Sequence, residues 1–202
     1  MRSKSLHIIS ALSLFWLLAS CTSSKIFSTD YYNKHEKTLS EIEQSYKKLY
    51  EQNRFSVGFT DRSFNDLSLE IYTDSIKYIY EFSINEPRFL DTLKKFDLPA
   101  QGIVDLINKM KSIQCIWVNN LDYYSNNQKR SLVFLSIRKL AFHLPFLNEK
   151  YYILTFYSQP QYFDEQGRLL STRRQRKLRK INDDIFHRIN DKVCYAVSER
   201  FR

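Results

Sequence analysis

Apolar residues spaced three and four positions apart predict four helices. The first covers residues 33–52, where Thr38 and Glu41 fit a capping box. Two more follow Asn85 as an N-cap and are separated by a break at Pro99. The fourth begins at Ser171 or Thr172. The residues expected to face inward are Leu39, Ile42, Tyr46, Leu49 and Tyr50; Phe89, Leu90, Leu93 and Phe96; Ile103, Val104, Ile107 and Met110; and Leu178, Ile181, Ile185 and Ile189.

Alternating or continuous apolar runs predict strands between these helices. The expected strands cover residues 54–60, 67–73, 76–83, 113–118, 131–137 and 151–157, and residues 193–197 form either a last strand or the end of the fourth helix. The runs 131–137 and 151–157 are apolar on both faces and should lie centrally in a sheet. Residues 119–129 are polar and predict a loop, and Gly167 marks a turn. This order predicts a single α+β domain over 34–202, with a mostly antiparallel sheet packed by several helices.

The first 20 residues carry the pattern of a secretory signal. Arg2 and Lys4 precede an apolar run over 7–19. This run is about a dozen residues long, whereas a membrane-spanning helix needs roughly twenty. We therefore interpret residues 1–20 as a cleavable signal peptide, followed by a polar tether over 21–33.

The apolar run closes on Leu18-Ala19-Ser20-Cys21, which resembles the lipobox of bacterial lipoproteins. The resemblance covers residues 1–21 only. It implies that a diacylglycerol is attached to the Cys21 thiol and that the chain is cut before Cys21. Acyl chains hold a protein on a bilayer, since each buried CH₂ contributes about 0.8 kcal/mol. The expected location is the bacterial cell envelope, on either the inner or the outer membrane. The alternative is an ordinary secreted protein with Cys21 in this place by chance.

The net charge of +9 is unevenly distributed. Residues 21–167 have 18 basic and 18 acidic side chains, whereas residues 168–202 have eleven basic and four acidic ones. Six of the basic residues cluster at the start of the expected fourth helix: Arg173, Arg174, Arg176, Lys177, Arg179 and Lys180. Near an anionic surface, each Lys or Arg gains on the order of 1 kcal/mol. The cluster is our candidate for binding anionic lipid, lipopolysaccharide or an acidic protein, with a merely solvated face as the alternative. Nucleic acid is the usual partner of such clusters, but export argues against it.

Two cysteines remain after Cys21. Outside the cytoplasm, Cys115 and Cys194 could form a disulfide. Both also have apolar neighbours, as buried cysteines usually do. The sequence leaves the two interpretations open, because pairing depends on a Cα separation that the sequence does not contain.

The rest of the sequence contains no motif for catalysis, metal or cofactor binding. Gly58, Gly102 and Gly167 are far apart, which excludes the clustered glycines of phosphate-binding loops. No serine lies in a nucleophile elbow, and no pair of histidines has the spacing of a zinc site. We expect no cofactor and no metal. We favour a non-enzymatic protein, while an active site assembled from scattered residues stays open.

Two functional hypotheses follow. The first is a non-enzymatic envelope lipoprotein with an interaction or accessory role, whose last helix docks on an anionic surface. The second is an envelope glycan-binding protein or hydrolase with a pocket between the strands and the helices. Tyrosine rings pack on apolar sugar faces, although such rings are more often buried. The candidate tyrosines are Tyr72, Tyr78, Tyr80, Tyr151, Tyr152 and Tyr157.

Overall fold

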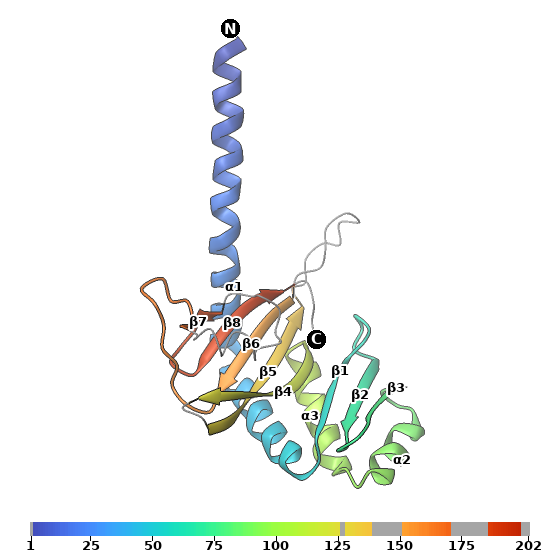
Figure 1. Ribbon diagram of the computed structural model, residues 1–202. Helices are drawn as coiled ribbons and strands as arrows, with labels where there is room; N and C mark the ends of the chain where they lie inside the picture. Colours follow the sequence, from blue (N-terminus) through green and yellow to red (C-terminus); the bar gives the residue numbers. More distant parts are fainter. Residues whose placement is uncertain (1, 126–127, 139–150, 171–185, 199–202) are drawn as a thin grey trace. The chain divides into compact units, whose positions relative to one another are not determined.

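The computed structural model divides the chain into two units, Met1–Glu36 and Lys37–Arg202, and each is described by itself. It describes residues 2–125, 128–138, 151–170 and 186–198. The first unit is the N-terminal part of helix α1 (Arg2–Gln52) (Figure 1). Among the described residues, no helix combines the length and the apolar content needed to cross a membrane.

Helix α1 begins far earlier than the sequence pattern predicts. The helix expected over 33–52 does end at Gln52, but it starts at Arg2. Residues 21–33, expected as a tether, are therefore helical, and Thr38 and Glu41 lie inside the helix, not at a capped start. The physical reason is that the first glycine is Gly58 and no proline precedes it, so no strong helix breaker interrupts this stretch.

The second unit is built on an antiparallel sheet with the strand order β3-β2-β1-β4-β5-β6-β8-β7 (Figure 1). Each neighbouring pair runs antiparallel. The strands are β1 (Phe55–Phe59), β2 (Asp66–Tyr72), β3 (Lys77–Ser83), β4 (Cys115–Ser125), β5 (Gln128–Arg138), β6 (Tyr151–Tyr157), β7 (His187–Arg188) and β8 (Val193–Ser198). The expected α+β class with a mostly antiparallel sheet is confirmed.

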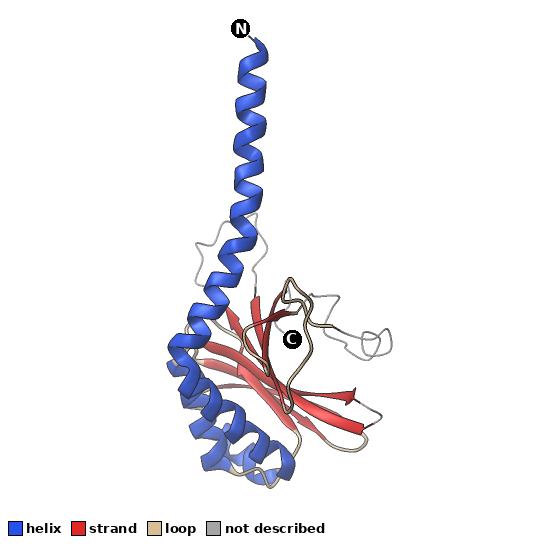
Figure 2. Ribbon diagram, turned by 90° about the vertical axis from the view of Figure 1, so that its left-hand side faces the viewer, coloured by secondary structure: helices blue, strands red, loops and turns tan. Residues whose placement is uncertain are grey.

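Helices cover one face of this sheet, which we call the helix face. They are the part of α1 from Lys37 onward, α2 (Pro87–Lys95) and α3 (Ala100–Ser112), and Figure 2 shows them on one side of the strands. Proline at the first position of α2 suits a helix start, because its missing N–H has no partner there in any case. Helix α2 begins one residue later than expected, with Glu86 instead of Asn85 as its N-cap.

Aromatic and aliphatic side chains fill the space between helices and sheet. The ring of Tyr46 on α1 lies 5.3 Å from that of Phe55 on β1, and Phe89 on α2 lies 5.4 Å from Phe82 on β3. The hydroxyl of Tyr46 donates a hydrogen bond to the backbone oxygen of Phe55. The predicted inward residues that are buried are Leu39, Ile42, Tyr46, Leu49, Phe89, Leu93, Ile103, Ile107 and Met110. Leu90, also expected inward, is 44% exposed.

The central strands match the sequence pattern. All seven residues of β6 are buried, and β6 lies between β5 and β8. The predicted strands 54–60, 67–73 and 76–83 correspond to β1, β2 and β3. The turn at Gly167 is also present, because the Gly167 N–H donates to the Asp164 oxygen at 2.9 Å and φ is 73°.

The loop expected over 119–129 is wrong, because most of it is strand. Strand β4 continues to Ser125 and β5 starts at Gln128, so the two form one long hairpin. Asp122 pairs with Ser131 in the register, and its carboxylate lies 2.8 Å from the Lys129 ammonium. The partner strand and this ion pair supply the stabilisation that the polar composition of the segment alone does not reveal.

The fourth helix, expected to reach Ile189, does not extend into residues 186–190. These residues form β7 and a turn, in which the Asn190 side chain accepts the N–H groups of Lys192 and Val193 at 2.9 and 2.8 Å. An asparagine that binds the backbone two and three residues ahead favours a turn over a helix. Residues 193–197 are a strand, β8, which decides between the two readings of that segment. The remainder of the expected helix, 171–185, lies outside the described residues.

The opposite face of the sheet, which we call the second face, is covered at its β5–β6–β8 end. Leu132, Tyr157, Phe186, Cys194 and Ala196 are buried there together. Phe163 and Leu169, from the segment that follows β6, pack against them. Both faces of the central strands are therefore dry, as their continuous apolar sequence requires.

Candidate functional site

The structure describes the two strongest sequence candidates only in part. Cys21 lies in α1. The basic cluster Arg173, Arg174, Arg176, Lys177, Arg179 and Lys180 lies outside the described residues. Its role as a binding segment therefore stays a prediction.

Cys115 and Cys194 are both buried and are not bridged to each other. Cys115 is on β4 and Cys194 on β8, with β5 and β6 between them. Strands lie about 4.8 Å apart, so three spacings separate the two residues by about 14 Å. A disulfide needs Cα atoms within about 7 Å. Of the two interpretations, the structure favours the buried thiols, and burial raises the pKa of Cys115 to about 12.

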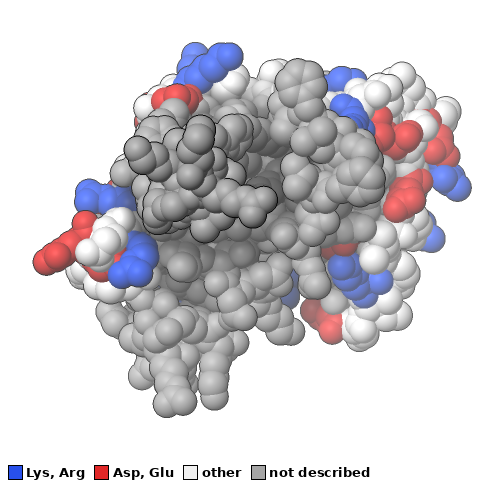
Figure 3. All heavy atoms as spheres, turned by 90° about the horizontal axis from the view of Figure 1, so that it is seen from above, with Lys and Arg blue, Asp and Glu red and all other residues white. Residues whose placement is uncertain are grey.

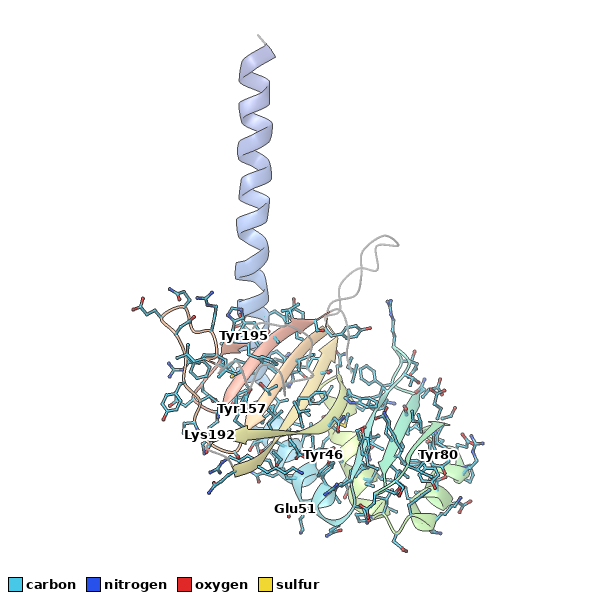
Figure 4. All side chains as sticks on the ribbon, in the orientation of Figure 1. Tyr46, Glu51, Tyr80, Tyr157, Lys192 and Tyr195 are labelled. Atoms are coloured by element: carbon cyan, nitrogen blue, oxygen red, sulfur yellow. The ribbon has the colours of Figure 1, made fainter. Side chains whose placement is uncertain are left out.

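The six tyrosines proposed as a sugar-binding platform do not share one surface. Tyr151, Tyr152 and Tyr157 are buried within β6. Tyr80 on β3 is far from Tyr157 on β6 in Figure 4. Tyr72 pairs with Lys77, whereas Tyr80 pairs with Leu69, so the two tyrosines point to opposite faces of the sheet. A platform made of all six is therefore wrong.

A buried polar cluster lies on the second face of the sheet, at β1, β2 and β3. It is centred on Glu70, whose side chain is only 6% exposed. Three donors converge on one of its oxygens, Oε2: the Tyr72 hydroxyl at 2.6 Å, the Lys77 ammonium at 2.8 Å and the Ser56 hydroxyl at 3.0 Å. We call these four residues the Glu70 cluster.

The register of β1 and β2 positions this cluster. Ser56 lies opposite Glu70, and Tyr72 lies two residues further along the same strand, so all three side chains are on one face. Lys77 pairs with Tyr72 on β3 and reaches Glu70 diagonally. The Asn119 amide of β4 adds a longer contact of 3.5 Å to the Tyr72 hydroxyl. The cluster thus joins three neighbouring strands through side chains, and the Asn119 contact links them to β4.

The cluster holds Glu70 in its charged form. Burial alone would raise the pKa of Glu70, but the hydrogen bonds from Lys77, Tyr72 and Ser56 and the charge of Lys77 lower it below its ordinary value. The pKa of Tyr72 is raised to about 12, chiefly by burial and then by its bond to Glu70. At neutral pH the cluster is therefore a carboxylate, an ammonium and a neutral phenol, an arrangement that locks strands together more readily than it transfers protons.

The sequence pattern around Glu70 does not indicate a buried cluster. Glu70 alternates with Leu69 and Ile71, which is the pattern of a strand with one solvated face. The Glu70 side chain is nevertheless buried, and Ser56, Tyr72 and Lys77 contact its carboxylate. The only signal in the sequence is that Ser56 and Glu70 sit at matching positions of the first two strands, and this becomes visible only when the pairing register is known.

A cavity of about 400 Å³ lies between α2, α3 and the connection from β3. Its lining is mainly apolar, with Ile84, Pro87, Phe89, Val104 and Ile107 among the contributing residues. The one titratable residue in the lining is Glu86, which pairs with Arg88 at 2.7 Å. Such a cavity suits an apolar group and lacks the convergent acid and base of a hydrolase.

The described charges are mixed in sign. On the face drawn in Figure 3, the coloured Lys and Arg side chains lie beside Asp and Glu side chains. Arg168 with Asp164 at 2.7 Å and Arg188 with Asp191 at 2.6 Å are two such pairs. Within the described residues, no group of three or more His, Cys, Asp or Glu is placed to hold a metal ion.

The comparisons with known proteins identify no relative. No protein-family model, no curated protein and no solved structure matches the chain.

Proposed function

We propose that the chain is a lipid-anchored protein of the bacterial cell envelope with an interaction or accessory role and without catalysis. The observation that carries this proposal is Leu18-Ala19-Ser20-Cys21 at the end of an apolar run of about a dozen residues. Cutting before Cys21 would leave this cysteine at the new N-terminus, where its lipid would attach the chain to a membrane.

The basic cluster gives this protein its proposed partner, an anionic surface. The charge distribution supports the assignment, because residues 21–167 carry equal numbers of acidic and basic side chains. The excess positive charge is confined to the last 35 residues. Anionic lipid headgroups, lipopolysaccharide phosphates and an acidic protein share the negative charge that such a segment attracts.

Metabolic labelling with a radioactive lipid precursor tests the anchor. We expect the wild-type chain to be labelled and Cys21→Ala to carry no label. Cys115→Ala is the matched control, since it also removes one thiol and should keep the label. An unlabelled wild type, or label retained in Cys21→Ala, would refute the anchor.

A glycan-binding protein is the second candidate, and the cavity between α2 and α3 is the observation that favours it. Its apolar lining ranks it below the first candidate, because sugars need several convergent polar groups for orientation. The test is sedimentation of the full chain with purified cell-wall glycan. Co-sedimentation that is lost when Val104 is replaced by a bulky tryptophan would support it.

A further inference from the structure

Strand β3 forms one edge of the sheet, and its outer side is open in the part of the chain that the structure describes. The first bond of the hairpin, from the Thr73 N–H to the Ile76 oxygen at 3.0 Å, sets the phase of the ladder. In an antiparallel pair, alternate residues direct their N–H and C=O groups toward the partner and the others direct them away. Tyr78 and Tyr80 therefore bond β2, while Lys77, Ile79 and Glu81 point their backbone groups outward.

The open stretch has definite limits. The bond from the Ile84 N–H to the Asn65 oxygen at 2.7 Å keeps the same phase at the far end of the strand. Ser83, the next outward residue, is already bonded on both sides by Glu86, through its N–H at 3.3 Å and its oxygen at 2.8 Å. The Arg88 guanidinium reaches the Glu81 oxygen only at 3.4 Å and lies closer to the Glu86 carboxylate. Residues 77–81 are thus a five-residue edge available for pairing.

This edge lacks two of the usual protections against pairing, a proline and a bulge. Natural edge strands are also protected by charged side chains, and here these are Lys77 and Glu81, which flank an apolar centre. The register of β2 and β3 is continuous, and β3 contains no proline. At its centre Ile79 is 56% exposed, and neighbouring Ile76 is 54% exposed. Both charges of the stretch, Lys77 and Glu81, lie two residues from Ile79 on either side, and they have opposite signs.

We propose that β3 pairs with β3 of a second copy of this chain, antiparallel and about a two-fold axis at Ile79. In this register Ile79 faces its own copy, and each Lys77 faces the partner's Glu81. Both copies contribute the same outward groups, so Lys77, Ile79 and Glu81 form six backbone hydrogen bonds. The resulting dimer is closed, because a two-fold contact uses the same surface of each copy.

Charge selects this register over its neighbours. The outward backbone groups belong to the odd-numbered residues of β3. Two copies can therefore form backbone hydrogen bonds only in registers that place odd-numbered residues opposite odd-numbered residues. A shift centred on Tyr78 would place Lys77 opposite Ile79, and a shift centred on Tyr80 would place Glu81 opposite Ile79. Opposite charges directly across an antiparallel pair stabilise it, while an unpaired charge beside an apolar residue does not. The pairing does not depend on the lipid anchor, so it can fail or hold independently of the proposed function.

A charge reversal at the edge tests the proposal. The full chain is produced as Cys21→Ser, so that no lipid is attached, and its mass is followed by light scattering over a concentration range in a non-ionic detergent. Glu81→Lys places like charges across both ends of the pairing and should weaken the dimer about tenfold. The matched control is Glu51→Lys, because Glu51 is exposed, lies at the end of α1 (Figure 4) and makes no ion pair with the described residues.

Two further measurements distinguish the loss of strand pairing from the loss of folding. Ile79→Pro removes the central outward N–H, which β2 does not use, so the domain should stay folded while the dimer is lost. The amides of residues 77, 79 and 81 should exchange more slowly as concentration rises, whereas those of 78 and 80 should be protected throughout.

A chain that is monomeric at every concentration tested would overturn the proposal. An association that Glu81→Lys and Glu51→Lys affect equally would also overturn it, because the contact would then lie elsewhere, for example in the apolar run over 7–19. Amides of 77, 79 and 81 that exchange at the same rate at all concentrations, in a chain that does associate, would exclude β3 as the contact.

Discussion

The indole of Trp117 lies over the backbone of Gly58, its pairing partner across β1 and β4. A Cβ at position 58 would lie 2.1 Å from Cε3 of that ring and 2.4 Å from the backbone oxygen of Ile116. The ring and the oxygen are both fixed in the buried sheet, so neither can move aside cheaply. Position 58 therefore requires glycine because Trp117 approaches the backbone closely. It does not require glycine because of a turn, since residue 58 lies in a strand.

Gly58→Ala should lower the free energy of unfolding by about 1–3 kcal/mol or more, the usual cost of overpacking. Gly102→Ala is the matched control. Its Cβ would lie 2.8 Å from the end of the flexible Leu49 side chain, which can turn away, and alanine is favoured over glycine in a helix by about 1 kcal/mol. Urea unfolding of both variants measures the difference. Equal destabilisation by the two substitutions would contradict the assigned contact.

Glu70→Gln should destabilise the domain at neutral pH by about 1–3 kcal/mol, the range for hydrogen bonds to charged groups. The folded pKa of Glu70 lies below its ordinary value, so the unfolded chain binds more protons in the acid range. The stabilisation is therefore present above the unfolded pKa and is lost as the pH falls through the folded pKa. Urea unfolding from neutral to acid pH should show wild type and variant converging.

Other carboxyl groups titrate in the same pH range. The contribution of Glu70 is therefore measured as the difference in unfolding free energy between Glu70→Gln and a control variant. The pKa values of Asp61 and Asp164 are also lowered, in both cases by backbone N–H groups that outweigh burial. Glu51→Gln provides the control, because Glu51 is exposed and lies at the end of α1, away from β3. A Glu70→Gln effect that is as large in acid as at neutral pH would show that the charge of Glu70 does not stabilise the fold.

The two buried thiols should be inert in the native protein. In the Cys21→Ser chain, Cys115 and Cys194 are the remaining thiols, and both should react with a thiol reagent only after unfolding. The pKa of Cys115, about 12, leaves about a thousandfold less thiolate at neutral pH than an ordinary cysteine. Colorimetric titration with and without denaturant counts the thiols. Fewer than two thiols in the unfolded, unreduced protein would reveal a bridge and contradict the strand order.

Replacing Arg173, Arg174, Arg176 and Lys177 together by glutamine should weaken binding to anionic vesicles by about a hundredfold to a thousandfold and flatten its salt dependence. A control variant that loses the same charge replaces four exposed lysines elsewhere: Lys37, Lys48, Lys94 and Lys192. Vesicle sedimentation at several salt concentrations measures both. If the two variants bind alike, net charge alone explains the attraction and the cluster has no special role.

The sequence was most informative where one segment's own pattern decides its structure. The stripe of Leu39, Ile42 and Tyr46 predicts the buried face of α1, and the continuous apolar run of β6 predicts its central place. The prediction from the pattern failed where residues outside the segment determine its structure. The polar residues 119–125 become strand only because β5 pairs with them, and Ile189 belongs to a turn because Asn190 binds the backbone beyond it.

The Glu70 cluster shows the same limit at a candidate site. Its members come from three strands, and each of them alone is an ordinary polar residue of an alternating segment. Their convergence depends on the register of β1 with β2 and of β2 with β3, which the sequence does not specify. Cys115 and Cys194 are the opposite case. The sequence allows them to form a disulfide, but β5 and β6 lie between their strands in the sheet.

The two edges of the sheet differ greatly in length, with seven residues in β3 at one edge and two in β7 at the other. Templated growth of a fibril needs both edges, because each added molecule must offer a fresh strand to the next. In the described part of this domain, β7 is too short to act as such a template, and residues 167–169 already bond its outer side. Joining two copies through β3 would use up the long edge of both, so the sheet would stop growing at once. In such a dimer, the unequal lengths of the two edges would prevent further strands from adding to the sheet.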